Sequence, residues 1–573
     1  MLRMSGEFVR KYLALFVTVL PIFCASPVCA ADTNASANPA LYYDYPLLGH
    51  CFYDFLDRLE ASGKAPLQSR IRPYLQFHFD SLQATTLGDR EMRRFLSEGH
   101  SSHFIAEGRI EQPDESGWNR FFQRTGIRKL KAFNWLYATN HHFAALRLED
   151  KFALTYQPVY GLEGIWTDPK ARGIRRSTAG FRFEGGFNRA VHFMVDFRDH
   201  GESGRSPYYP GDQLYEDHWA FLDIEPGARS VSYDISESFV QWYGRNISVA
   251  LGRGRHQWGP GRFGQLFLSA EGPPFDYARL DAVLRGPRGL ALYYTFLQGV
   301  LKPVDAPGDT LYPVANGRLR IIDARKFFSA QRFELRARSN LLLGFSQGVI
   351  YGDRGVELAY FTPLSFLYSV QHAQGDKDNL LLSFDATWQP FCGLVTYGEL
   401  LVDDMALAEF FSNAARNRSA FTLGLHAIPL PAWRFLDAQA EYTRVRPFVY
   451  SHVFPVNRYM HWESPLGYTL EPNSEFITCQ LRATFYPAQF GFRWQRQNHG
   501  GGEDVGGDIY APFLGSSGSY PFLAGELERT DRYSITALLE LLENFLIEGR
   551  VTRIDEPIGD TRTESAVSLS WNF

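Results

Sequence analysis

The sequence predicts an all-β fold: a transmembrane antiparallel β-barrel of about 18 strands with a small N-terminal periplasmic helical domain. Three observations support this prediction, namely an alternating terminal strand, a regular series of hairpins and an N-terminal secretory signal. We expect a signal peptide over residues 1–30, a periplasmic helical region and linker over 31–130, and the barrel over 131–573.

The last residues of the chain, 565–573, alternate strictly between apolar and small polar side chains. Val567 and Leu569 share one face, while Ser568 and Ser570 share the other. A period of two is that of a strand. In an outer-membrane barrel such a strand closes the sheet, with its apolar face toward lipid and its polar face toward the lumen.

Alternating strands recur from about residue 137, and the connections between them fall into two classes. Nine short turns are expected near residues 149–151, 185–189, 243–246, 286–289, 339–340, 389–393, 429–432, 487–489 and 543–544. Long connections, rich in Gly, Pro, Asp and Tyr, include residues 200–226, 304–316, 446–473 and 498–526. Short turns at one end and long loops at the other are typical of outer-membrane barrels, and the hairpin number sets the strand count.

The N-terminus has the features of a secretory signal. Arg10 and Lys11 precede the apolar run 12–23, and a small-residue cleavage site ends at Ala30. That run is too short to span a bilayer comfortably, and no later stretch reaches 18 apolar residues, so we predict no transmembrane helix in the mature chain. The predicted location is the cell outer membrane.

The composition fits this class of protein. Aromatic residues make up 15% of the 573 residues, as interfacial girdles require. Removing the signal changes the net charge from −5 to −7, which argues against nucleic acid as a partner. Cys51, Cys392 and Cys479 have no metal-like spacing. They are interpreted as packing residues, with one disulfide left open.

Two short helices are expected before the strands. Apolar residues recur at helical spacing through 52–61, which Gly63 ends, and a second helix over 89–97 starts at Asp89. Together they indicate a small helical subdomain, or alternatively a lid or plug with no separate role.

One stretch matches a catalytic motif, Gly344-Phe345-Ser346-Gln347-Gly348. A nucleophile elbow needs a strand–turn–helix context, and no helical pattern follows here. We therefore predict no catalytic residue and no enzyme activity, with an outer-membrane hydrolase using Ser346 as a minor alternative.

Neither possible metal-binding stretch has suitable ligand spacing. The acidic run 503–508 lacks the EF-hand pattern, and the neighbours His141 and His142 would point to opposite faces of a strand. No metal and no cofactor are predicted.

The glycine-rich stretch 252–262 is the most unusual in the chain. It gathers a set of basic and aromatic residues: Arg253, Arg255, His256, Trp258 and Arg262. Aromatic faces stack on sugar rings and arginine grips carboxylates, so this loop suits an acidic polysaccharide. Alternatively the loop folds into the barrel and pairs its arginines with lumen acids such as Glu399, Asp403 and Asp404.

Two further clusters extend the predicted polysaccharide-binding set. They are Arg444 with Arg446, and Trp494 with Arg496. Residues two apart share one strand face, so each pair could face the lumen together.

At these residues the sequence resembles the capsule assembly Wzi family, from about residue 45 to the end. The helical start at residues 57–63 also looks like that family. The matching motifs are Trp258-Gly259-Pro260-Gly261, residues 359–363, Asp378-Asn379, residues 397–400, Asp403-Asp404, residues 442–452 and 464–467. The long loops 200–226 and 498–526 depart from the pattern.

The resemblance implies a barrel of about eighteen strands with periplasmic helices and a non-catalytic role. It implies lectin-like binding that attaches or assembles capsular or extracellular polysaccharide at the cell surface. We expect a monomer in contact with outer-membrane lipid. The alternative is a porin or channel for anionic solutes, with the same arginines lining an open pore.

Overall fold

The structure is a computed structural model of the chain. It describes residues 56–58, 60–61, 66–73, 144–148, 152–168, 172–187, 190–204, 229–244, 246–303, 311–313, 319–321, 325–375, 377–403, 412–414, 417–428, 435–485, 488–510, 518–542, 545–556 and 561–572. The predicted signal peptide and the second predicted helix lie outside these residues.

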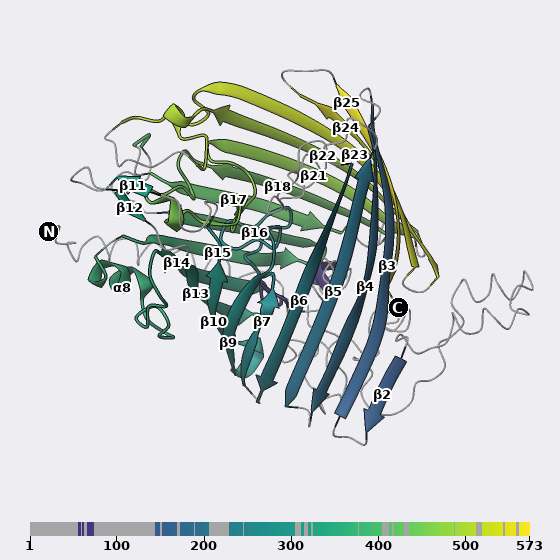
Figure 1. Ribbon diagram of the computed structural model, residues 1–573, viewed down its shortest axis with the longest axis horizontal. Helices are drawn as coiled ribbons and strands as arrows, with labels where there is room; N and C mark the ends of the chain where they lie inside the picture. The colour runs from purple at the N-terminus through teal and green to yellow at the C-terminus, as the bar shows by residue number, and fades with distance from the viewer. Residues whose placement is uncertain are drawn as a thin grey trace, which may run out of the picture.

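Eighteen antiparallel strands among the described residues form a closed barrel (Figure 1). This confirms the predicted antiparallel barrel and its strand count. Each wall strand pairs with the next one along the chain, and β25 pairs back with β3. The wall consists of β3 Phe152–Asp168, β4 Arg172–Phe187, β5 Val191–Gly204, β6 Ser230–Tyr243, β7 Ile247–Gly254, β9 Phe275–Arg285, β10 Ala291–Leu301, β13 Lys326–Arg338, β14 Leu341–Gly352, β15 Asn379–Phe391, β16 Leu394–Asp403, β17 Ser419–Ala427, β18 Leu436–Val445, β21 Ser474–Phe485, β22 Ala488–Gly501, β23 Glu526–Leu542, β24 Phe545–Asp555 and β25 Arg562–Asn572.

Smaller elements lie between or beside the wall strands. They are β1 Ile71–Arg72, β2 Ala144–Leu148, β8 Gln257–Trp258, η5 Pro287–Gly289, β11 Leu311–Pro313, β12 Leu319–Ile321, α8 Leu367–Ala373, η7 Pro455–Asn457, β19 Met460–His461, β20 Ser464–Pro465 and η8 Glu503–Val505.

The wall has two chemically different faces. Large apolar side chains such as Leu162, Leu251 and Ile535 are exposed on the outside, where a barrel in the outer membrane meets lipid. On β25, Val567 and Leu569 are exposed while the intervening side chains are more buried, as the alternation predicted. No helix in the described part of the chain is long and apolar enough to cross a membrane.

The connections between strands are short turns at one end of the barrel and mostly long loops at the other, as predicted. Each expected short turn falls between two consecutive strands, from β2–β3 to β23–β24. The longest links, among them residues 255–274, 353–378 and 446–473, join strands at the other end. The β3–β4 and β24–β25 connections are exceptions at that end, because only a few residues separate those strands.

The seam of the barrel is built from three strands. Along β3, residues 159–168 pair with β25, whereas Phe152–Tyr156 pair with β2. The closing strand β25 therefore pairs with only the C-terminal part of β3, and β2 pairs with the N-terminal part of the same edge.

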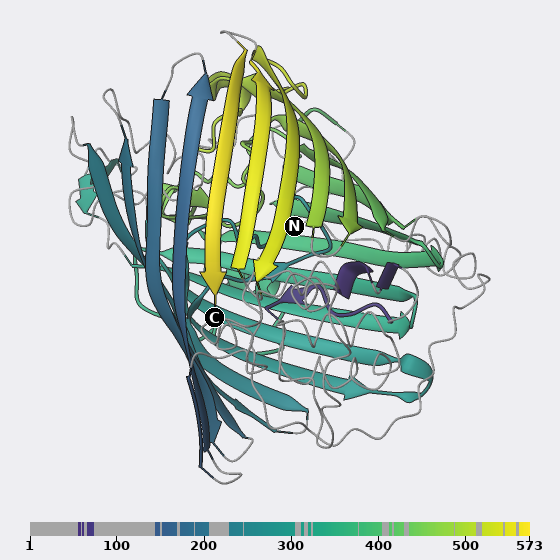
Figure 2. The same cartoon turned by 90° about the vertical axis from the view of Figure 1, so that its right-hand side faces the viewer.

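Residues 56–73 enter the barrel from the end with the short turns. Gly393 N donates to Ala61 O at 2.6 Å, and Leu67 N donates to Ser339 O at 2.9 Å. Further along, β1 pairs with β8. Figure 2 shows this segment, in purple, within the ring of strands. Cys392, in the turn where Ala61 docks, is disulfide-bonded, so the packing interpretation was wrong for this residue.

Candidate functional site

The stretch 255–274 folds into the barrel and forms part of an internal plug with residues 66–73. Trp258 is buried, its backbone N–H donates to Leu268 O at 2.9 Å, and its ring stacks on Phe267 at 5.8 Å. Both aromatic rings belong to a large core cluster that also includes Ile71 of β1. In this structure the Trp258 ring therefore has no face open to a sugar.

One glycine of this stretch is required for steric reasons. Gly259 has a φ of +121°, and a Cβ there would lie 2.7 Å from Glu399 Oε2. The Glu399 carboxylate instead accepts the N–H groups of Leu266 and Phe267. A side chain at position 259 would displace this acid from the loop that it holds.

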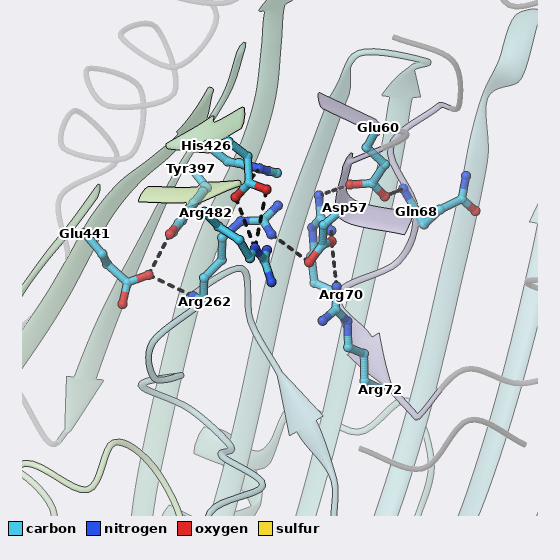
Figure 3. Close-up of polar contacts among 12 residues, drawn as sticks. Asp57, Glu60, Gln68, Arg70, Arg72, Arg262, Tyr397, His426, Glu441 and Arg482 are labelled. Carbon is cyan, nitrogen blue, oxygen red and sulfur yellow. Dashed lines mark hydrogen bonds and ion pairs between the residues drawn. The ribbon is translucent and has the colours of Figure 1, made fainter. Parts of the chain in front are cut away.

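A buried ion cluster fixes the folded-in loop to the N-terminal segment (Figure 3). Asp57 accepts from Arg262 Nη1 at 2.7 Å and from Arg72 Nη2 at 2.8 Å, and lies 3.5 Å from Arg70 Nη1. Burial alone would raise the pKa of the Asp57 carboxyl. The charges of the three arginines outweigh burial and hold that pKa well below its usual range.

The tip of the loop is also fixed to the wall. The backbone N–H of Arg262 donates to Glu441 at 2.8 Å, and the hydroxyl of Tyr397 donates to the same carboxylate at 2.7 Å. The Arg262 side chain thus pairs with an acid, as the folded-in alternative proposed, but the acid is Asp57 instead of those suggested, and Glu441 holds the backbone. Asp404 lies outside the described residues.

The other candidates in this stretch take separate positions. Arg255 extends into the lumen and pairs with Glu237 at 2.7 Å. His256 is buried against Tyr277 at a ring distance of 4.3 Å, and burial, with the nearby Arg279 charge, holds its pKa well below the usual value. Arg253 continues the outward face of β7 and pairs with Asp276.

The two remaining clusters face outward, so the expectation that they face the lumen was wrong. On β18 the inward residues are Glu441 and Thr443, which leaves Arg444 on the outer face, where it lies 3.6 Å from the Phe522 ring. Arg446 continues that face and donates to backbone carbonyls of residues 412 and 417.

Trp494 and Arg496 continue the exposed outer face of Phe492 on β22. Arg496 pairs with Asp531 at 2.8 Å, and its guanidinium lies 5.2 Å from the Trp494 ring. The predicted site residues are therefore divided between the plug, the lumen and the outer wall, and form no single surface.

Ser346 lies in the middle of β14, so the nucleophile-elbow geometry is absent. Its hydroxyl is buried and accepts a hydrogen bond from Arg332 Nη1 at 2.7 Å. Arg332 also pairs with Asp385 and Glu334 inside the wall. The serine thus belongs to a buried structural network.

A second internal layer comes from the β18–β21 connection, residues 446–473. Its inner side packs Tyr450 against Tyr459 at 5.5 Å, and their hydroxyls donate to Leu266 O and Phe267 O. This connection thus lies over the folded-in loop and covers it at the end with the long loops.

The outer side of this connection exposes aromatic rings. Phe454 and Tyr510 are each about two-fifths exposed, and Trp462 is half-buried. We call residues 446–473 and 502–510 the cap. The cap aromatics were missed from the sequence, although Trp462 lies within a predicted long loop, which was the available signal.

The cap aromatics are held in place by their neighbours. Phe454 N donates to His452 Nδ1 at 3.1 Å and the residue precedes η7. Tyr510 contacts the Arg458 guanidinium at 5.3 Å, and burial together with nearby Glu463 raises its pKa to about 12. Trp462 has a φ of +52° and donates its backbone N–H to Lys302 O. Preorganised rings lose little conformational entropy on binding a ligand.

Comparison with known proteins identifies the family of this chain. The model of the family described as capsule assembly protein Wzi matches residues 176–552, well over half of the chain. This chain belongs to the capsule assembly Wzi family. It is an outer-membrane protein. No curated protein matches the chain.

Several solved barrels match the chain at low identity. One is Wzi of Escherichia coli, described as an outer-membrane protein involved in group 1 capsule assembly and a carbohydrate-binding β-barrel. It is 11% identical, with 90% of this chain and 96% of that chain covered and a TM-score of 0.49. OpdK of Pseudomonas aeruginosa, solved with vanillate, is 10% identical over 73% of this chain and 98% of that chain, with a TM-score of 0.42. OccAB4 of Acinetobacter baumannii is 9% identical over 74% and 98%, with a TM-score of 0.40.

In this Wzi family member, the motifs that carry the resemblance lie at contacts of the plug and the long loops. Tyr397 and Glu399 hold the folded-in loop, and Asp403 accepts the N–H of Tyr450 in the cap at 2.7 Å. In the β14–β15 connection, Tyr360 donates to Asp378 at 2.7 Å. The family motifs therefore help to hold both the plug and the long loops in place.

Proposed function

We propose that this protein binds capsular or extracellular polysaccharide at the cell surface without catalysing a reaction, and that the cap carries the binding surface. The observation that supports the proposal most is the cap itself, which has a packed inner side and fixed aromatic rings on its outer side. Aromatic rings held at a surface suit the apolar faces of sugar rings. The Wzi family membership and the carbohydrate-binding relative agree with this role.

The charge of the cap favours uncharged sugar segments. Acidic residues Glu463, Glu471 and Asp508 lie near the exposed Tyr510 ring, whereas Arg458 is buried beneath it. A carboxylate-bearing sugar would be repelled there. We therefore propose that the cap stacks on neutral residues of the polymer, in contrast to the acidic ligand that the arginine-rich loop suggested.

Binding of polysaccharide purified from the host strain tests the proposal. The Trp462→Ala variant should bind about fivefold more weakly, since one ring contact contributes roughly 1 kcal/mol. Trp494→Ala, which removes a ring from the outer wall, is the matched control and should bind as the native protein does. Carboxyl-reduced polymer should bind at least as well as the native polymer. Equal binding by all three proteins would overturn the proposed surface.

The alternative function, a channel for anionic solutes, predicts high conductance, whereas a plugged polysaccharide-binding barrel predicts low conductance. The plug fills much of the interior with a packed core and paired ions, which favours low conductance for the native barrel. Planar-bilayer recordings distinguish the two functions, because a porin would show large, steady single-channel steps. Such steps with the native protein would favour solute passage over polymer binding.

A further inference from the structure

The β14–β15 connection, residues 353–378, lies against the outside of the barrel wall. Phe327 and Val349 share the outward faces of β13 and β14, and both pack with Tyr360 and Leu367 of this connection. Figure 1 shows α8 beside these strands. A long loop at the outer end of the barrel has therefore folded down over the wall instead of over the lumen.

The wall beneath this connection also carries polar side chains next to the apolar ones. Ser329, Gln331 and Gln347 are buried on the outward face, in phase with the exposed Leu335. Bare in hydrocarbon, each would leave a costly unsatisfied polar group.

The connection satisfies these groups with its own backbone and side chains. Ser329 Oγ donates to Tyr360 O at 2.6 Å, and Gln331 Nε2 donates to Ser365 Oγ at 3.3 Å. Gln347 Nε2 donates to Ser365 O at 2.9 Å and its Oε1 accepts from Leu367 N at 2.9 Å. This part of the wall is thus built to receive a protein cover.

The far side of the same connection is apolar and exposed. Six large side chains of this connection are exposed: Val356, Leu358, Phe361, Leu364, Phe366 and Tyr368. The Phe361 ring also contacts Phe296 of β10, at 5.8 Å between ring centroids. Leu358 is 77% exposed and Leu364 70%, which exceeds the 61% of Leu162 on the lipid-facing wall. Leu364 is also held at a φ of +66°, with its N–H donated to Tyr294 Oη at 3.0 Å. A non-glycine residue in this region costs energy that other contacts must offset.

The height of the wall indicates what covers this surface. On β14 the outward apolar residues below the cover run from Leu341 to Phe345, and Gln347 follows. Four residue steps span about 14 Å along a strand, and less along the membrane normal because barrel strands tilt. The apolar band of an outer-membrane barrel is about 25 Å tall. Above Phe345 the connection covers the outward residues of β14, including Val349, so the wall strand itself cannot present the upper part of the band to lipid.

We propose that the outward apolar side of residues 356–368 contacts acyl chains of the outer leaflet and completes the lipid-facing band over β13 and β14. The surface is continuous with the lipid-facing wall, through outward residues such as Leu335 and Phe384. An apolar segment with this arrangement lies at the boundary of headgroups and acyl chains. The inference is independent of polysaccharide binding and requires only that the barrel is in a membrane.

Spin labels test the proposal in the folded, full-length protein. The free Cys479 is first replaced by serine, while the disulfide-bonded Cys392 is kept. Single cysteines at Leu364 and Phe366 are then labelled, and the protein is placed in phosphatidylcholine vesicles. Ile535→Cys provides a label on the lipid-facing wall, and Asp504→Cys a label in water.

Accessibility to oxygen and to a water-soluble nickel chelate is measured by power saturation. Labels at 364 and 366 should favour oxygen over nickel, as the Ile535 label does, because oxygen concentrates in acyl chains. A preference for nickel like that of the Asp504 label would overturn the proposal. Low accessibility to both reagents would show a protein cover, such as a second copy, and would overturn it as well. Heat-modifiable migration in gels confirms that each labelled barrel is folded.

Discussion

Arg262 and Asp57 are 205 residues apart in the chain, yet Arg262 Nη1 lies 2.7 Å from Asp57 Oδ2 inside the barrel. Both side chains are almost completely buried. The ion pair joins the folded-in loop to the N-terminal segment, and Arg70 and Arg72 extend it. Two distant parts of the sequence are thereby held as one plug.

Replacing Asp57 by asparagine should loosen this plug. The change leaves three buried arginines short of a counter-charge, and breaking a buried pair costs roughly 3–5 kcal/mol. We expect a lower thermal unfolding temperature in detergent and faster proteolysis of the N-terminal segment. Asp276→Asn removes an exposed ion pair with Arg253 and serves as the matched control. Its unfolding temperature should stay near the native value. An equal effect of both changes would contradict a special role for Asp57.

The contribution of Asp57 should depend on pH in a defined direction. Its pKa in the folded protein is held below the ordinary value of 3.8. The stabilisation is therefore complete above that ordinary value and is lost as pH falls through the folded pKa. The difference in unfolding temperature between the native protein and Asp57→Asn should stay constant from neutral pH to about pH 5, then shrink in stronger acid. A difference that changes between pH 7 and 5 would point to another titrating group.

Trp258→Ala should destabilise the protein instead of weakening ligand binding directly. The side chain is buried in the plug core, and removing a large buried aromatic ring costs roughly 3–5 kcal/mol. Chemical unfolding in detergent would measure the loss. Trp494→Ala on the half-buried outer wall makes the same chemical change and should cost clearly less. If Trp258→Ala kept native stability but lost polysaccharide binding, Trp258 would be a ligand contact.

Gly259→Ala should also destabilise the plug. Alanine at a φ of +121° is strained, and its Cβ would approach the Glu399 carboxylate. A cost of roughly 1–3 kcal/mol is expected. Gly549→Ala is the control, since a Cβ there meets no atom within 4 Å, and it should be neutral or slightly stabilising. Thermal unfolding of the two variants checks the contrast.

The barrel could be predicted because its pattern is local. A period of two and the spacing of short turns are visible without knowledge of distant contacts, and they gave the strand number correctly. The double use of the β3 edge could not be foreseen, since β2 and β25 come from opposite ends of the barrel sequence.

The site residues were harder to predict, because alternation groups residues by face without saying which face is inside. Arg444 and Arg446 do share a face, but it is the outer one. Trp494 and Arg496 also share an outer face, on β22. The in-phase apolar residues Phe490 and Phe492 before Trp494 were the signal that their face meets lipid. Burial of Trp258 depends on β1, more than 180 residues earlier in the chain, which no local pattern reveals.

The shared edge of β3 has a consequence for any shortened form of the protein. On the edge that does not pair with β4, five residues of that strand, Phe152–Tyr156, have partners only in β2 among the described residues. A chain that began after Leu148 would bring their unpaired amide and carbonyl groups into hydrocarbon, at several kcal/mol for each group. The β2 segment is thus a structural part of the closed barrel, and removing it would leave part of the wall unpaired.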